Sequence, residues 1–195
     1  MLFRSGKSAP EAISAPQGAA WSPASAVALN GDGDVAGNTS SFPISSACAP
    51  PAGVAVPSNR AFVSLAKEGA RTAELLPLIP DDKTMTSLSV TGINNRKQII
   101  GMRQGVDCAE AVVIRGQRAA LWQVEGGRWT AYALDRLPIS FPPQCAHDVI
   151  LTSARGINDI GQITGAGLCI DQNEEKVEFA YRLTPIGPGE AEPRP

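Results

Sequence analysis

The chain has 195 residues, which is long enough for one domain with a substantial core. Its net charge is −2 and 18% of its residues are charged, so the composition gives no electrostatic reason to expect binding to nucleic acid or to an anionic membrane. No stretch approaches the roughly 20 apolar residues of a membrane span, and 19 glycines with 16 prolines favour many short strands and turns.

Residues 1–14 open the chain with two short extended runs around a turn at 5–7. They resemble the second hairpin of a repeat unit whose first hairpin is missing. The start also lacks the basic-then-apolar order of a signal peptide. We therefore expect either a cytosolic chain or a mature or internal piece of a longer secreted protein.

One short motif, an asparagine turn between two extended runs, occurs three times, at 28–37, 92–101 and 156–165. Its asparagines, Asn30, Asn94 and Asn158, are 64 residues apart in both steps (94 − 30 and 158 − 94). An asparagine at the first turn position can hydrogen-bond its own backbone two residues on. The pattern predicts three copies of one β-hairpin.

Glycines at fixed places in this motif predict its backbone. Gly33 and Gly161 occupy the fourth turn position, which suits a left-handed residue in a longer hairpin connection. Lys97 stands there in the second copy, at an expected cost of roughly 1–2 kcal/mol. Each copy closes on a glycine where we expect a neighbouring atom to pack closely, and these are Gly37, Gly101 and Gly165.

The first copy alone offers alternating oxygens, from Asn30, Asp32 and Asp34, in the manner of the start of a calcium loop. Its sixth position is not glycine, its twelfth is Ser41, and the other copies lack the acids. We therefore favour plain turns and assign no metal ligand, cofactor site or catalytic residue.

A second hairpin follows each asparagine hairpin and begins with an aromatic residue among small or aliphatic ones, at 61–65, 120–124 and 179–183. Such alternation is typical of strands. One unit is thus four strands. We expect a half unit at 1–20, unit one at 21–80, unit two at 81–140, unit three at 141–184, and a disordered tail at 185–195.

At these residues the chain resembles the HAF repeat family of bacterial extracellular repeats, whose pattern is Ile-Asn-x-x-Gly-Gln-Val-x-Gly followed by Ala-Phe-Leu-Trp. Units two and three match best, at 93–101 with 120–122 and at 157–165 with 179–181. Unit one departs at Asp34, and unit two departs at Lys97. The resemblance implies a layout similar to a β-propeller and a secreted or surface-exposed protein, and it carries no catalytic residue.

The expected fold is therefore all-β, with repeated four-stranded antiparallel sheets. A closed propeller needs about 4–8 blades, so we expect a partial propeller or one that a second copy completes. The alternative is a pseudo-threefold body of the β-prism or trefoil type. The half unit could also pair with unit three and join the two chain ends.

Four cysteines are present, and none forms a C-x-x-C pair, so zinc or thioredoxin-like chemistry is not indicated. An even count in turn-rich loops favours disulfides in an oxidising compartment. Cys145 with Cys169 or with Cys108 is the preferred bridge. Cys48 is the fourth, and four unpaired thiols remain the alternative.

Few residues suggest a catalytic or sugar-binding role. His147 and Asp148 could form a dyad with a nucleophile among Ser140, Cys145, Thr152 and Ser153, but a surface histidine is favoured. The acid pairs Asp81–Asp82 and Glu174–Glu175 would serve a glycosidase only across a cleft. Trp21, Trp122 and Trp129 could stack on sugars, although we expect Trp122 in the core and Trp129 on a sheet surface.

The sequence thus predicts a non-enzymatic extracellular or periplasmic module that binds a protein or glycan ligand, with a homo-oligomer completing the ring as one option. The alternatives are a polysaccharide hydrolase or lyase that uses loop carboxylates, and a structural fragment of a longer surface protein.

Overall fold

The structure is a computed structural model of the whole chain. It describes residues 12–14, 24–42, 58–66, 73–79, 87–107, 113–137 and 142–185. The expected turn at 5–7, the tail from 186 onward, Trp21, Cys48, Asp81, Asp82, Cys108 and Ser140 lie outside these residues.

The described part of the chain is all-β, as the sequence predicts, and its one helical segment is the short 3-10 helix η1 (Leu134–Arg136). None of its helices has the length and apolar character to cross a membrane. The strands are β1 (Ala24–Leu29), β2 (Val35–Phe42), β3 (Ser58–Ser64), β4 (Glu74–Leu75), β5 (Ser87–Ile93), β6 (Ile99–Asp107), β7 (Val113–Glu125), β8 (Arg128–Ala133), β9 (His147–Ile157), β10 (Ile163–Ile170) and β11 (Lys176–Leu183).

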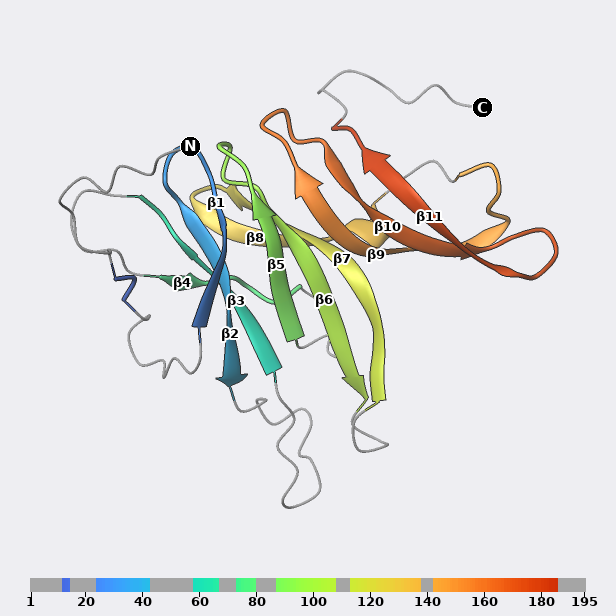
Figure 1. Cartoon of the computed structure of the whole chain (residues 1–195), viewed down its shortest axis with the longest axis horizontal. Helices are drawn as coiled ribbons and strands as arrows, with labels where there is room; N and C mark the ends of the chain where they lie inside the picture. Colours follow the sequence, from blue (N-terminus) through green and yellow to red (C-terminus); the bar gives the residue numbers. More distant parts are fainter. Residues whose placement is uncertain are drawn as a thin grey trace, which may run out of the picture.

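These strands form three antiparallel sheets that follow one another along the chain (Figure 1). Sheet one has the order β1-β2-β3-β4, sheet two β5-β6-β7-β8, and sheet three β9-β10-β11. Each sheet thus begins with the asparagine hairpin and continues into the aromatic hairpin. Sheet three has three strands in the described residues.

The sheets stack through two separate apolar clusters. The first lies between sheets one and two and contains Val63, Leu76, Val90, Ile99 and Trp122. The second lies between sheets two and three and contains Ile100, Leu134, Leu151, Ile163 and Phe179. A threefold body would place all three sheets around one core, whereas these sheets meet in consecutive pairs.

The half unit adds to sheet one at the point where it is described. The backbone N–H of Ala73, beside β4, donates to the carbonyl of Ser14 at 2.9 Å. The expected alternative, in which this half unit joins unit three, is therefore not the pairing found at Ser14. The described residues form no closed ring.

A shared irregularity explains the closing glycines. The pairing of β1 with β2, β5 with β6 and β9 with β10 shifts register beside each of them. A Cβ atom on Gly37, Gly101 or Gly165 would collide with a backbone carbonyl of the preceding strand. The carbonyls belong to equivalent serines, Ser25, Ser89 and Ser153. The β-bulge of the repeat therefore requires glycine opposite it.

Candidate functional site

In all three turns the asparagine side chain makes the same two hydrogen bonds to the residue four positions on, and we call this pair of bonds the clamp. Its Oδ1 atom accepts from the backbone N–H four residues on, at 2.8 Å for Asn30, 2.9 Å for Asn94 and 2.8 Å for Asn158. Its Nδ2 atom donates to the side chain of that same residue. Asn94 alone also accepts from the N–H two residues on, the bond expected from sequence.

The fourth turn residue is left-handed in every copy. Gly33 and Gly161 both have φ of 85°, and Lys97 has φ of 58°. The backbone N–H of each of these residues donates to the carbonyl of its turn asparagine. Lys97 therefore adopts a conformation that its Cβ disfavours, because the rest of the turn is the same as in the glycine copies.

The three turns are also bonded to one another, and we call these bonds the turn ladder. Asn30 Nδ2 donates to the Asn94 carbonyl at 3.0 Å, and Asn94 Nδ2 donates to the Asn158 carbonyl at 2.8 Å. The next residue repeats the pattern, because the N–H groups of Gly31 and Asn95 donate to Oδ1 of Asn95 and Asp159. The ladder fixes three turns in a row along one side of the stack, one from each sheet.

Sequence reasoning found the interval of the turns but missed the ladder. The available signal was the residue after the asparagine, which carries a side-chain oxygen in Asn95 and Asp159 and none in Gly31. The exposure of the turn asparagine differs along the ladder, and Asn30 in the first turn is 9% exposed. Asn94, in the middle, is 3% exposed, whereas Asn158, at the end, is exposed.

The candidate calcium ligands do not converge. Asp34 is buried, and its two carboxylate oxygens accept from Asn30 Nδ2 at 3.0 Å and from the backbone N–H of Ala66 at 2.7 Å. Asp32 is exposed on the turn. No three His, Cys, Asp or Glu side chains in the described ranges are grouped to hold a metal ion. Asp34 instead ties the end of β3 to the first turn.

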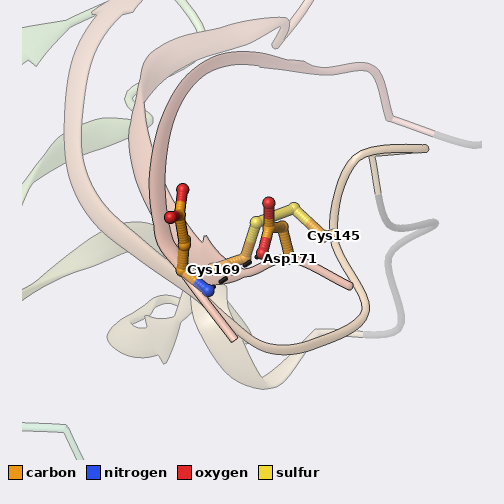
Figure 2. Close-up of a disulfide and its surroundings, with 4 residues drawn as sticks. Cys145, Cys169 and Asp171 are labelled. Atoms are coloured by element: carbon orange, nitrogen blue, oxygen red, sulfur yellow. Dashed lines mark hydrogen bonds between the residues drawn. A yellow bond between two sulfur atoms is a disulfide. The ribbon is translucent and has the colours of Figure 1, made fainter. Parts of the chain in front are cut away.

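A disulfide joins Cys145 to Cys169, one of the two expected pairings (Figure 2). It fastens the segment before β9 to strand β10, and a backbone bond from Ala146 to Ile170 lies beside it. The following turn is held by Asp171, whose Oδ1 accepts from the N–H groups of Asn173 and Glu175. These bonds lower the pKa of Asp171, that from Glu175 contributing most.

His147 lies next to this turn and contacts two carboxylates. Its Nδ1 is 3.1 Å from Asp148 Oδ2, and its Nε2 is 3.5 Å from Glu174 Oε1. Asp148 first, and then Glu174, raise the pKa of His147, because both favour the protonated ring. All three side chains are substantially exposed.

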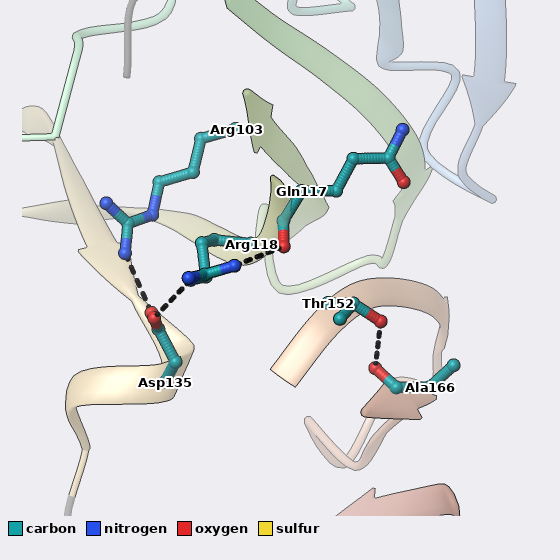
Figure 3. A network of polar contacts seen from close by, with 6 residues as sticks. All are labelled: Arg103, Gln117, Arg118, Asp135, Thr152 and Ala166. Atoms are coloured by element: carbon teal, nitrogen blue, oxygen red, sulfur yellow. Dashed lines mark hydrogen bonds and ion pairs between the residues drawn. The ribbon is translucent and has the colours of Figure 1, made fainter. Parts of the chain in front are cut away.

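The nucleophiles considered for His147 have other partners or positions. Thr152 Oγ1 donates to the Ala166 carbonyl at 2.9 Å (Figure 3), Cys145 is in the disulfide, and Ser153 is buried. Among the acids, Glu125 and Asp171 have pKa values below the ordinary range, for Glu125 because Tyr132 and Gln123 donate to it. A general acid needs the opposite shift.

One ion network lies between sheets two and three. Arg103, 2% exposed, contacts Asp135 Oδ1 through Nη2 at 2.8 Å, and Arg118 Nε lies 3.4 Å from Asp135 Oδ2 (Figure 3). Burial lowers the pKa of Arg103 while Asp135 opposes that effect. Burial, aided by the Asp135 charge, raises the pKa of Tyr181, whose hydroxyl donates to the Ser153 carbonyl. The ion pairs lie within sheet two and η1, and the Tyr181 bond lies within sheet three, so the effect of the Asp135 charge on Tyr181 is the link between the two sheets in this network.

The tryptophans do not form a shared surface in the described residues. Trp122 is fully buried, and its Nε1 donates to the Pro77 carbonyl at 2.9 Å. Trp129 packs on the same core cluster. The most distinctive described feature is therefore the turn ladder with its exposed polar groups.

In comparisons with known proteins, no family model, no curated protein and no solved structure matches the chain. Its resemblance to HAF repeats rests on the motif residues alone.

Proposed function

We propose that this chain is a non-enzymatic binding module of the extracellular space or periplasm, built as a partial β-propeller of HAF-like repeats. The observation that carries the proposal is the turn ladder. It fixes three loops, one from each sheet, relative to one another along one side of the stack, as a binding surface requires. The Cys145–Cys169 disulfide supports an oxidising compartment.

The binding surface is the row of exposed turn residues, which we call the turn ridge. It presents Asp32 from the first turn, Asn95, Arg96 and Lys97 from the second, and Asp159 from the third. Arg96 extends along the row, since its Nη1 donates to the carbonyl of Ile160 at 3.3 Å. Both charge signs and one side-chain amide are thus held in a fixed order, which suits a polar protein or glycan ligand.

The positions of the carboxylates on the ridge support ligand binding and not glycoside hydrolysis. The carboxylates of the ridge lie on different turns, and Asp159 already accepts from the backbone and side chain of Asn95. A glycosidase needs two carboxyl groups facing each other across a cleft, one with a raised pKa. The buried Asp34 and the partly buried Asp135 already make structural contacts.

The test combines a glycan array with a pull-down from periplasmic and surface fractions, using the wild-type chain and two variants. The ridge variant carries Arg96→Ala and Lys97→Ala, and the control carries Lys176→Ala and Arg182→Ala on the exposed side of β11. We expect a ligand whose affinity for the ridge variant is at least tenfold lower than for the wild type. Its affinity for the control should be unchanged. No ligand in either assay, or release of reducing sugar from an arrayed polysaccharide, contradicts the proposal.

A further inference from the structure

The two outer sheets of the stack, sheets one and three, differ in the residues that they expose. This difference indicates which kind of partner each can bind. Strand β1 is an edge strand of sheet one, and its sequence Ala-Ser-Ala-Val-Ala-Leu carries no charge and is exposed at five of six positions. Val27 and Leu29 are 46% and 67% exposed. The residues equivalent to Leu29 in sheets two and three, Ile93 and Ile157, belong to core clusters.

In the described part of the chain, no hydrogen bond joins the outer edge of β1 to another sheet, unlike the edges of β5 and β9. The edge of β5 binds Asn38 of sheet one, whose Oδ1 accepts from the Val90 N–H at 2.7 Å. The edge of β9 binds Thr91 of sheet two, whose Oγ1 donates to the Ala154 carbonyl at 2.6 Å. Within the described residues, β1 pairs with β2 alone.

The far end of the stack cannot supply the missing neighbour. In sheets one and two the pairs Ala36–Val63 and Ile100–Leu121 face the next sheet, but sheet three has Thr164 and Arg182 at the equivalent paired positions, both exposed. A polar outer face is how a repeat array ends. The ladder also ends at Gly31, which has no side-chain oxygen to accept from the Asp159 N–H of another copy.

We infer that β1 pairs edge to edge with β1 of a second copy of this chain, forming a two-fold dimer with one sheet continuous across both copies. This pairing joins β1 to β1, and not β1 to sheet three of another copy, because the exposed face of sheet three is polar. An uncharged strand also creates no charge repulsion across a two-fold axis. The dimer covers Leu29 and leaves the turn ridge of each copy free. It is independent of the proposed binding function.

The test measures weight-average molar mass by sedimentation from roughly 1 μM to 1 mM, a range suited to an interface below standard size. We compare the wild-type chain with Leu29→Lys and with Ile160→Lys, a control at the other end of the stack that is 65% exposed. The wild type and the control should rise from 20.3 kDa toward twice that mass. Leu29→Lys should stay at 20.3 kDa, with an unchanged circular dichroism spectrum.

Hydrogen exchange at the two ends of that concentration range provides the second measurement. The amides of β1 should exchange more slowly at high concentration in the wild type, and those of β10 should not change. The inference is overturned by a wild-type chain that stays monomeric, by assemblies larger than two copies, or by equal loss of association in the Ile160→Lys control. Protection of the sheet-three face instead of β1 overturns it as well.

Discussion

The two inter-sheet interfaces come from the same repeat but are filled differently. The interface between sheets one and two is mainly apolar and surrounds the fully buried Trp122. The interface between sheets two and three has Ile, Leu and Phe179 but no tryptophan in its cluster, a buried arginine beside Asp135 on sheet two, and a disulfide within sheet three at its border. The repeat thus sets the backbone positions, whereas the side chains that pack between the sheets differ from one interface to the other.

We expect the largest loss of stability from a substitution in the first interface. Trp122→Ala should cost about 3–5 kcal/mol of the free energy of unfolding, since it empties the core and leaves the Pro77 carbonyl without its donor. Urea denaturation measures this. Phe179→Ala in the second interface should cost less, because phenylalanine is smaller than tryptophan and donates no side-chain hydrogen bond. Equal or reversed costs would show that the two interfaces do not differ in the way described.

Removing the cross-link should weaken the second interface selectively. Cys145→Ala combined with Cys169→Ala should cost about 3 kcal/mol, given the sequence separation of 24 residues. Hydrogen exchange should become faster in β10 than in β6. Uniform acceleration over all three sheets would mean that the disulfide stabilises the stack as a whole.

The turn ladder spans both interfaces and can be tested at its middle and its end. Asn94→Ala removes the donor to the Asn158 carbonyl and the clamp of its own turn, so it should cost about 2–3 kcal/mol. Asn158→Ala loses only the clamp and should cost about 1 kcal/mol. Similar losses in thermal or urea unfolding would argue that the inter-turn bond contributes little.

A smaller effect concerns the one turn that departs from the repeat. Lys97→Gly should stabilise the chain by about 0.5–1 kcal/mol, because the relief of the left-handed strain exceeds the added freedom of the unfolded chain. The reverse change, Gly161→Lys, should destabilise it. If the melting temperature falls in Lys97→Gly, the lysine side chain supports the turn in another way.

The smallest effect is a pH dependence at the border of sheet three. The folded pKa of His147 lies above its ordinary 6.5, so its small stabilisation is complete below that pH and is lost as pH rises through the folded value. His147 is the one histidine in the chain, so its proton resonance gives the titration directly. Asp148→Asn should lower the midpoint more than Glu174→Gln does. An unshifted wild-type midpoint contradicts the contact geometry.

The local chemistry was readable from the residues. Glycine at 33 and 161 follows from the left-handed turn, and glycine at 37, 101 and 165 follows from a backbone that leaves no room for a Cβ atom. Strand alternation and aromatic hairpins were enough to predict an all-β chain, and loop cysteines were enough to favour a disulfide. These features depend on near neighbours in the sequence, so periodicity and residue type carry the information.

Partners distant in sequence were decided by tertiary structure. Nothing in the motif indicates that Asn30 donates to the carbonyl of Asn94, or that the sheets meet in consecutive pairs around two cores instead of one. Choosing between Cys169 and Cys108 as the partner of Cys145 likewise required the spatial path of the loops. The sequence by itself determined the hairpin, because its turn and bulge are local steric requirements. Only packing decided which hairpin lies beside which, because that choice depends on the apolar area and hydrogen bonds of residues 64 positions apart.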